Sequence, residues 1–392
     1  MNVAVVAHFY PPEPCAAATR IASLAAALTR AGHDVTVVTT FPSFPTDCFL
    51  AGSRPVPLRS ERCGEVRVVR LWSLLVRGLP GRRLLHWGSA AFAAAGYLLL
   101  TRRRYDQIIV SLPPITLAPV GIIAAWRHRA KLVADVRDVF PDIAIAMGAW
   151  RPNGFWARAV ERLARALYRR ADLIVAVTPT ALEQIAARGV DPARLLLVRN
   201  AAEHMAAVPR AAPCGGFTAI YAGNLGVATD VDLLLEAARL LTREGITIAV
   251  VGDGARGREL AERARGVANL VLRGSLPRAA AMRAVAAADV AIVPLRKGIA
   301  ESVPTKLYDA VAVGCPVVVA GDGEARTEGA ALGALCVAAG DAAALAAALR
   351  RLAALDRQAL RALGDQGRAR LAARADRAAV MGEFAARVTA LG

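Results

Sequence analysis

The most constraining feature of this sequence is a series of short apolar runs that alternate with stretches of helical periodicity. The first 40 residues contain the run Val3–Ala7, a helical pattern over about 19–31 and a second run, Val35–Thr39. Strands that are buried on both faces of a parallel sheet read as continuous apolar runs. The opening of the chain therefore predicts a parallel α/β unit.

The same rhythm continues to about residue 200, breaks over 201–216 and then restarts. The break has no periodicity and carries two prolines and two glycines, which is typical of a linker. The remaining strands are expected at Val66–Leu71, Gln107–Ser111, Leu132–Asp135, Leu173–Val177, Leu195–Val198, Thr218–Ala222, Thr247–Val251, Leu270–Arg273, Val290–Val293 and Val317–Ala320. In the second half, helices are expected over about 230–243, 255–265, 277–287 and 304–313.

We therefore predict an α/β protein with two Rossmann-like domains facing each other across a cleft. The N-terminal domain covers 1–200, 201–216 is the linker, and 217–370 forms the C-terminal domain. A closing helix over 371–392 is expected to pack back towards the N-terminal domain. Ligands of such sheets sit at the carboxyl ends of the strands, so the cleft is the expected active site.

The positive charge of the chain is concentrated in its first half. The formal net charge is +17, and residues 1–200 carry 26 basic and 13 acidic side chains. An anionic partner is expected, either nucleic acid or a membrane surface. Aromatic residues make up only 5% of the chain and no helix-turn-helix or RRM-like run is present, so nucleic acid is the less favoured partner.

The cysteines and the N-terminus bear on the cellular compartment. The six cysteines form no CxxC pair and no cluster with histidines, which gives no support to a zinc site or a disulfide scaffold. The N-terminus lacks a basic segment before its apolar run and meets prolines after ten residues, unlike a signal peptide. We expect a cytoplasmic protein with reduced thiols.

The segment Leu84–Leu100 departs from the α/β plan. It has no formal charge and lies between Arg82-Arg83 and Arg102–Arg104. As a helix of about 25 Å it is at the lower limit for crossing a bilayer. A helix lying on the membrane surface is the favoured interpretation. A buried core helix and a true membrane span are the alternatives.

The stretch GIAESVPTKLYDAVAVGCPVVVA, residues 298–320, carries the strongest chemical signal. Ser302 is the expected N-cap of a helix with Pro304 in its first turn and Gly314 at its end. The free N–H groups of a helix N-terminus favour a phosphate, and Lys306 adds a point charge there. A solvated helix lysine is the alternative for Lys306.

Two carboxylates flank this expected phosphate site. Glu301 precedes the helix, and Asp309 lies about 7 Å along it from Pro304. Carboxylates would repel a phosphate, so they indicate hydroxyl groups instead. Ribose and sugar hydroxyls are the obvious ligands.

The spacing Glu301-x7-Asp309 followed by AVAVGCPVV resembles the donor-binding motif of family 4 retaining glycosyltransferases, which have the GT-B fold. The N-terminal run FYPPEPCAAATRIASLAAALTRAGHDVTVVTTFPSFP resembles the subgroup of L-fucosaminyltransferases typified by WbuB. Further matching segments occur in the expected order over about 1–330: GRRLL, SLPP, VADVRDVFPD, LARALYRRADLIVAVTP, YAGNLG, VGDG and VPTKLYDAVAVGCPV.

The resemblance implies roles for the residues of the second half. Glu301 would contact the donor sugar or the diphosphate, and Asp309, one methylene shorter than the usual Glu, would hold the ribose. Lys306, with the amides near it, would hold the diphosphate. The residues expected to line the donor site are Gly223, Asn224, Gly252, Gly254, Pro304, Thr305, Lys306 and Asp309.

Two features of this donor site call for separate interpretations. Gly252 and Gly254 would let a base approach the backbone, or would simply form a tight turn. The family often has an Arg and then a Lys where this chain has Asn224 and Thr229. The charge of the phosphate would then fall to Lys306, with Lys297 and Arg256 in reserve.

In the first half the family's glycine-rich loop is replaced by Cys15-Ala16-Ala17-Ala18. Arg20 would face the phosphates or lie exposed on its helix. Arg137 and Asp138 would orient the acceptor hydroxyl, or would pair with each other to cap their loop. Asn200 is a further candidate for the cleft, and no histidine is assigned a role.

The resemblance implies a glycosyltransferase that retains the anomeric configuration, with an acceptor-binding domain over 1–200 and a donor-binding domain over 217–370. The expected donor is a UDP-linked sugar, such as an N-acetylated amino or deoxyamino hexose, and the expected acceptor is a saccharide, for example one linked to polyprenyl diphosphate. The resemblance implies no bound cofactor and no metal ion. We expect a role in O-antigen or capsule synthesis at the inner face of the plasma membrane, and an anionic membrane surface as partner. A UDP-sugar 2-epimerase and a non-enzymatic binder of nucleic acid or membrane are the alternatives.

Overall fold

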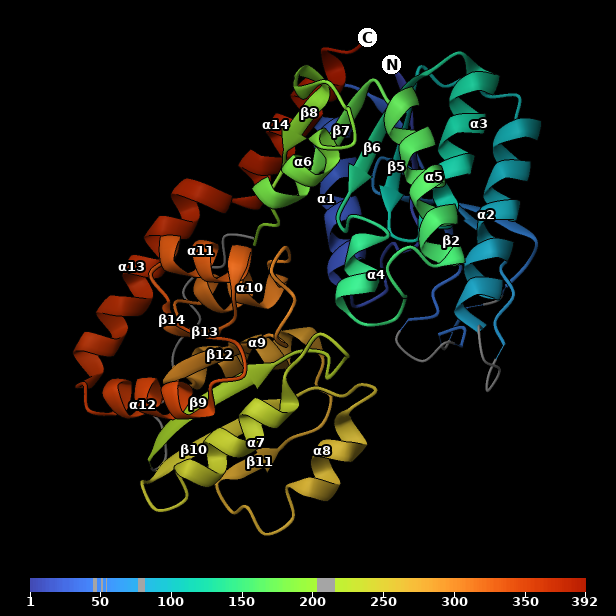
Figure 1. The fold of residues 1–392 in the computed structure, drawn as a ribbon. Coiled ribbons are helices and arrows are strands. Elements are labelled where there is room, and N and C mark those ends of the chain that lie inside the picture. Colours follow the sequence, from blue (N-terminus) through green and yellow to red (C-terminus); the bar gives the residue numbers. More distant parts are fainter. Residues whose placement is uncertain (45–47, 51, 54, 77–81, 203–215) are drawn as a thin grey trace. The chain divides into compact units, whose positions relative to one another are not determined.

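The computed structural model describes residues 1–44, 48–50, 52–53, 55–76, 82–202 and 216–392. They form two compact units, one of Met1–Arg199 with Ala378–Gly392 and one of Asn200–Arg377 (Figure 1). Each unit is built on a mainly parallel sheet with helices, so the predicted two-domain α/β fold is confirmed. Of the predicted linker 201–216, residues 203–215 lie outside the described residues.

The first unit has a sheet of eight described strands in the order β3-β4-β2-β1-β5-β6-β7-β8. Neighbouring strands are parallel except for β3, which runs antiparallel to β4. Its strands are β1 (Asn2–Val6), β2 (Asp34–Thr40), β3 (Leu58–Cys63), β4 (Val66–Leu71), β5 (Gln107–Leu112), β6 (Lys131–Val136), β7 (Leu173–Ala176) and β8 (Leu195–Leu197). Its helices are α1 (Ala16–Arg30), α2 (Arg82–Leu100), α3 (Ala118–His128), α4 (Asp142–Ala146), α5 (Phe155–Arg170), α6 (Pro179–Ala186) and α14 (Arg377–Thr389).

Both faces of this sheet are covered, which explains the continuous apolar runs. Successive side chains of a strand point to opposite faces. Val3 and Val5 of β1 pack into a core formed with α1 and α14, whereas Ala4 and Val6 pack into a second core formed with α2, α3 and α5. Figure 1 shows helices on either side of the sheet.

The helix α14 belongs to the first unit although almost 180 residues separate it from the rest of that unit. Phe384 and Val388 are fully buried in the core beneath β1 and α1. The side-chain amide of Gln107 donates to the Val388 carbonyl at 2.6 Å, and His33 Nε2 lies 2.7 Å from Thr389 Oγ1. The second unit ends at Arg377, and the chain then returns to the first unit.

The second unit has a sheet of six described strands, all parallel, in the order β11-β10-β9-β12-β13-β14. Its strands are β9 (Phe217–Ala222), β10 (Ile246–Val251), β11 (Leu270–Leu272), β12 (Val290–Pro294), β13 (Val317–Ala320) and β14 (Leu335–Val337). Its helices are α7 (Val231–Leu240), α8 (Gly257–Arg263), α9 (Arg278–Ala287), α10 (Thr305–Ala312), α11 (Gly323–Ala331), α12 (Ala342–Ala353) and α13 (Arg357–Ala375). Residues of α7, α8, α12 and α13 share one core with the sheet.

Every predicted strand is present, to within two residues at each end, but two strands were not predicted. The edge strand β3, with the sequence LRSERC, carries three charged residues and has no buried face. Charge on an edge strand discourages pairing with other chains, and it also hides the strand from hydrophobicity patterns. The other, β14, has only three residues.

The charge-free segment 84–100 lies within α2, which is buried along one side only. Ala90, Ala91, Ala94 and Leu98 face the core, whereas Phe92 on the opposite side is 84% exposed. The helix α2 thus packs against the core with one side and exposes the other. Over the described ranges, no helix has the length and apolar character needed to cross a membrane.

Candidate functional site

Two loops of the second unit bring the four predicted residues Gly223, Asn224, Gly252 and Gly254 together. The first loop follows β9 and the second follows β10, which is its parallel neighbour. The N–H of Gly223 donates to the Val251 carbonyl at 2.9 Å. The loops therefore meet at the carboxyl edge of the sheet, where ligands of such folds bind.

The glycines of the second loop are required by the contact between the two loops. A Cβ on Gly254 would lie 2.7 Å from the carbonyl carbon and oxygen of Leu225. A Cβ on Gly252 would collide with the carbonyl oxygen of Gly223, and its φ of +138° is one that other residues rarely adopt. The packing of the loops thus accounts for these glycines without a ligand.

Lys306 lies directly over the first loop and is held there by Tyr221. Its Nζ is 2.6 Å from the Tyr221 hydroxyl and 4.5 Å from the centre of the tyrosine ring. A Cβ on Gly223 would be 3.1 Å from both Cε and Nζ of Lys306. Lys306 is therefore not a fully solvated helix lysine, which was the alternative interpretation.

The hydroxyl of Tyr221 is itself fixed by a small buried network. It donates to the main-chain oxygen of Asn224 at 2.7 Å and lies 3.0 Å from Thr229 Oγ1. Thr229 donates to the same oxygen at 3.0 Å. The threonine that stands where the family often has a lysine thus helps to place Lys306 in this chain.

Lys306 is the second residue of α10, at the N-terminus of that helix. Pro304 is the N-cap and gives no side-chain hydrogen bond, and the first turn has no acidic residue. The predicted N-cap Ser302 was wrong, because the helix starts later, at Thr305. The first N–H groups of a helix need a partner, and an anion suits them.

The two predicted carboxylates lie on either side of this helix start. Glu301 is partly buried in the loop between β12 and α10. Asp309, one turn into α10, pairs with Arg278 of α9, the nearest oxygen and nitrogen being 2.9 Å apart. Asn200, which was expected in the cleft, lies with its amide nitrogen 3.5 Å from the Val303 carbonyl, just before the helix.

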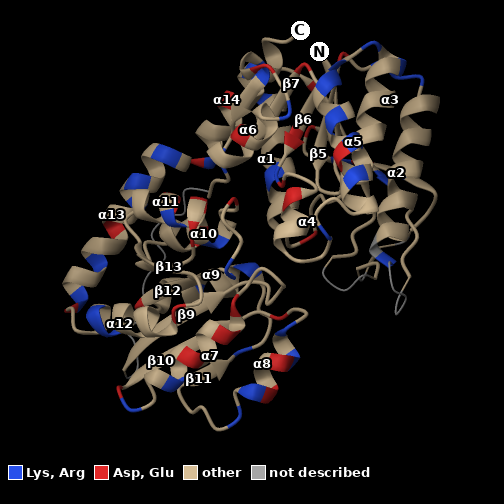
Figure 2. Cartoon of the chain, in the orientation of Figure 1, with Lys and Arg blue, Asp and Glu red and all other residues tan. Residues whose placement is uncertain are grey.

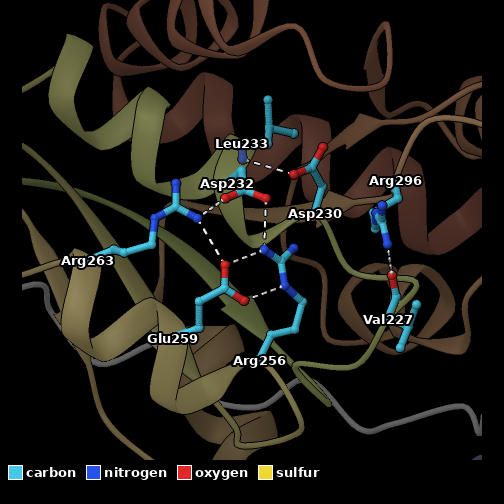
Figure 3. A network of polar contacts seen from close by, with 8 residues as sticks. All are labelled: Val227, Asp230, Asp232, Leu233, Arg256, Glu259, Arg263 and Arg296. Carbon is cyan, nitrogen blue, oxygen red and sulfur yellow. Dashed lines mark hydrogen bonds and ion pairs between the residues drawn. The ribbon is translucent and has the colours of Figure 1, made fainter.

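The reserve cation Arg256 is committed to a network of ion pairs (Figure 3). Its guanidinium contacts Glu259 at 2.7 Å and Asp232 at 2.9 Å, and Arg263 joins the same two carboxylates. These hydrogen bonds, above all those with Glu259, raise the pKa of Arg256 above its usual value. Of the cations considered for the phosphate, Lys306 is the one that lies over the glycine loop.

In the first unit, Arg20 lies in a buried ion pair and not at the surface. Its Nη2 is 2.8 Å from Asp135 Oδ1, and both side chains are almost inaccessible to water. Ser111 donates to the other oxygen of Asp135 at 2.9 Å. The guanidinium of Arg20 therefore ties α1 to the central strand β6.

Arg137 and Asp138 follow β6 at the carboxyl edge of the first sheet. Both residues are described, and they form no ion pair with each other, so the alternative of a loop-capping pair is not observed. Arg137 donates to the Pro113 carbonyl at 3.1 Å, while its buried Nε has no hydrogen-bond partner. Burial raises the pKa of Asp138 and lowers that of Arg137.

His8, to which the sequence assigned no role, lies close to this pair. It ends the segment after β1, is 3% exposed, and its ring stands edge-on to that of His86 at 4.7 Å. Burial, together with His86 and the charge of Arg137, lowers the pKa of His8 to about 3. In the sequence, only its position after the first strand could have marked His8 as a candidate for the site. A lone histidine at such a position is a weak indication.

In the part of the chain that the structure describes, no three His, Cys, Asp or Glu side chains form a group that could hold a metal ion.

Comparisons with known proteins match both units separately. Residues 16–201 match the family model described as a glycosyl transferase 4-like domain, and residues 216–354 match the model of glycosyl transferases group 1. The chain is a glycosyltransferase of the GT-B superfamily.

Relatives and solved structures agree with this assignment. The chain is 26% identical over 357 residues, 86% of each sequence, to the putative colanic acid biosynthesis glycosyl transferase WcaI of Escherichia coli. Over its full length it superposes on sucrose-phosphate synthase of Thermosynechococcus elongatus with a TM-score of 0.77 at 18% identity. HepE of Anabaena, solved in complex with UDP, gives a TM-score of 0.70 at 16% identity, again over both full chains. These two structures share the fold of this glycosyltransferase.

Proposed function

We propose that this glycosyltransferase transfers a sugar from a UDP-sugar to a saccharide acceptor, with retention at the anomeric carbon. The observation that carries the proposal is the position of Lys306, fixed by Tyr221 over the loop of Gly223 at the N-terminus of α10, which has no side-chain cap. A fixed ammonium beside free helix N–H groups suits a diphosphate leaving group. The UDP complex of HepE, which has the same fold, supports uracil as the base.

In the proposed reaction the bond between the anomeric carbon and the β-phosphate oxygen breaks on the face where the acceptor oxygen attacks. The electron pair of that bond leaves with the diphosphate, whose growing charge Lys306 and the first amides of α10 stabilise. The proton of the acceptor hydroxyl passes to the departing phosphate. Because these groups are already in place, the reaction does not have to reorganise them.

The two carboxylates around α10 serve the hydroxyl groups of the donor in this proposal. Glu301 would hold the sugar and Asp309 the ribose. Asp309 is paired with Arg278, so the ribose would share that carboxylate or replace the arginine. In the first unit, Arg137 and Asp138 are proposed to orient the acceptor, since Arg137 still has a buried N–H without a partner.

The proposed acceptor is a saccharide carried on polyprenyl diphosphate, used in building a surface polysaccharide at the inner face of the plasma membrane. The similarity to WcaI, a putative glycosyl transferase of colanic acid biosynthesis, supports a polysaccharide pathway. The resemblance of the N-terminal run to L-fucosaminyltransferases supports an N-acetylated amino or deoxyamino hexose as the donor sugar. No metal ion or other cofactor has a part in this proposal.

The test is thermal stabilisation of the full chain by UDP, GDP, ADP and dTDP. At 100 times its dissociation constant a ligand adds about 2.7 kcal/mol of stability. We expect stabilisation by UDP and its loss in Lys306→Gln, with a smaller loss in Asp309→Asn. Arg258→Gln is the matched control, because that side chain is 93% exposed on α8.

Incubation with UDP-sugars and a saccharide acceptor then separates the enzyme classes. Release of UDP together with a lengthened acceptor supports the proposal. Conversion of the sugar with UDP still attached would establish an epimerase instead. Stabilisation by duplex DNA, steeply weakened by salt, with no response to any nucleotide, would favour the nucleic-acid binder.

A further inference from the structure

An apolar surface on the outside of the first unit has no partner among the residues of that unit that the structure describes. It comprises the outward side chains of α2 and of the end of α3, and we refer to it as the α2–α3 surface. Three of its members, Phe92, Leu100 and Trp126, are 84%, 84% and 73% exposed. The full set is Leu84, Leu85, Phe92, Leu99, Leu100, Ile123 and Trp126.

The two helices that form this surface lie side by side and point the same way. At their C-terminal ends, Arg127 Nε donates to the Leu99 carbonyl at 3.2 Å, and His128 Nε2 lies 2.8 Å from the Leu98 carbonyl. At the other end, Thr116, just before α3, donates to the Trp87 carbonyl at 3.2 Å. The exposed side chains of α2 and α3 therefore form one continuous face.

The outward side of α2 carries no charge between its first turn and its end. In Figure 2 the ribbon of α2 is tan along this length, whereas that of α5 is marked with blue and red. A helix that is merely solvated normally presents polar and charged residues on its outer side. An apolar patch of this kind usually marks an interaction site.

The rim of the α2–α3 surface is strongly basic. Residues 82–130 contain seven arginines and a single carboxylate, Asp106, which accepts a hydrogen bond from the Asn2 N–H at 2.7 Å. Arg103 is paired with Asp34. Within the described structure, four other rim arginines have no ion pair: Arg102, Arg104, Arg127 and Arg129.

We propose that the α2–α3 surface binds an anionic phospholipid bilayer, with α2 lying in the plane of the interface. The apolar side chains would enter the boundary between headgroups and acyl chains, where Trp126 is well suited to sit. The arginines at the rim would contact lipid phosphates. This inference concerns the membrane surface and holds whatever sugar the enzyme transfers.

The distribution of charge favours a bilayer over a second copy of the chain. Arginines lie at both ends of α2, at Arg82 and at Arg102–Arg104. A pair of α2 helices, packed either parallel or antiparallel, would therefore bring arginine against arginine. A bilayer instead offers phosphates around an apolar interior, which matches an apolar stripe with basic ends.

The experiment is sedimentation of the full chain with vesicles of phosphatidylcholine, alone or mixed with phosphatidylglycerol. We expect binding to the mixed vesicles that weakens as salt is added. Phe92→Asp should reduce the partition coefficient by on the order of tenfold or more, because it places a charge in the apolar face. Arg102→Glu should reduce it about fivefold or more.

Two control variants carry the same changes on the second unit. Leu363→Asp alters an exposed leucine of α13, and Arg258→Glu reverses an exposed arginine of α8. Both should bind vesicles like the unchanged protein. All four positions are exposed, so equal melting temperatures will show that the variants are folded.

The fluorescence of Trp126 gives an independent readout. The emission of the chain should shift to the blue on adding mixed vesicles, and Trp126→Phe should remove most of that shift. The proposal is overturned if the unchanged protein does not bind mixed vesicles, or if Phe92→Asp and Arg102→Glu bind as well as the controls. A dimer that Phe92→Asp converts to monomer, with vesicle binding unchanged, would assign the surface to a second copy.

Discussion

At the scale of single residues, the proposed donor site depends on Tyr221, which contacts Lys306. The hydroxyl of Tyr221 accepts from Lys306 and donates to the Asn224 carbonyl, so it sets the height of the ammonium above the glycine loop. We expect Tyr221 to act as a positioning residue. Without it, Lys306 would no longer be held in one place.

The variant Tyr221→Phe tests this role. Hydrogen bonds to charged groups are worth about 1.5–3 kcal/mol, so UDP should bind about tenfold more weakly, with KM for the donor raised more than kcat is lowered. Binding of UDP is measured by calorimetry. Tyr168→Phe removes the hydroxyl of another buried tyrosine, in the first unit, and should leave UDP affinity unchanged. If both variants bind UDP as the unchanged enzyme does, Tyr221 does not position Lys306.

The sequence could point to Lys306 but not to Tyr221. Lys306 lies within a local motif at the start of a helix, where spacing along the chain carries the information. Its contact with Tyr221 joins residues 85 positions apart, and only folding brings them together. The same holds for Arg20, whose partner Asp135 is 115 positions away.

His8 gives a prediction for the dependence of stability on pH. Its pKa is about 3 in the folded protein and about 6.5 when unfolded, so below pH 6.5 the unfolded chain binds a proton that the folded chain excludes. Stability should therefore fall as the pH drops from 6.5 towards 3, by up to about 1.4 kcal/mol per pH unit from this residue. Urea unfolding at pH 7, 6 and 5 should show a shallower decline in His8→Asn, and parallel declines would contradict the expectation.

At the scale of secondary-structure elements, the joint between α1 and β6 depends on one buried ion pair. Asp135→Asn would leave the charge of Arg20 buried without a counter-charge, which typically costs about 3–5 kcal/mol. Chemical denaturation of the full chain, followed through the unfolding of the first unit, measures this loss of stability. The exposed pair of Arg258 and Glu262 is the control, and Glu262→Gln should cost far less.

A double variant distinguishes a buried charge from lost packing. Arg20→Met with Asp135→Leu removes both charges and should be more stable than Asp135→Asn alone. An equally damaged double variant would mean that shape and hydrogen bonds, and not charge, hold α1 to β6.

The elements show where sequence patterns succeed and fail. Central strands such as β1 are buried on both faces and almost wholly apolar, so they are recognised from composition alone. The edge strand β3 has no buried face and carries charged residues, so its sequence pattern resembles that of a loop. The start of α10 was placed too early, because Ser302 has the chemistry of an N-cap whereas Pro304 occupies that position.

At the scale of the whole molecule, the first unit needs its C-terminal helix. Phe384 is fully buried against β1 and α1, and replacing a buried phenylalanine by alanine typically costs about 3–5 kcal/mol. Phe384→Ala should therefore destabilise the first unit while the second keeps its stability. Phe92→Ala, at an exposed position, is the control and should stay within about 0.5 kcal/mol of the unchanged protein.

Melting followed by calorimetry checks this expectation. Two transitions should be seen, of which only the one that belongs to the first unit moves in Phe384→Ala. Saturating UDP should raise the other transition and so identify it. If both transitions shift together in Phe384→Ala, the helix supports the molecule as a whole and not the first unit alone.

The return of α14 also has a consequence for synthesis of the protein. Ribosomes add about 5–20 residues per second, so on the order of ten seconds or more pass between the emergence of residue 199 and that of residue 378. During this interval the first unit lacks the part of its core that α14 supplies. The domain that is made first is thus completed last, and a nascent chain interrupted at about residue 377 would expose an incomplete core to chaperones and proteases.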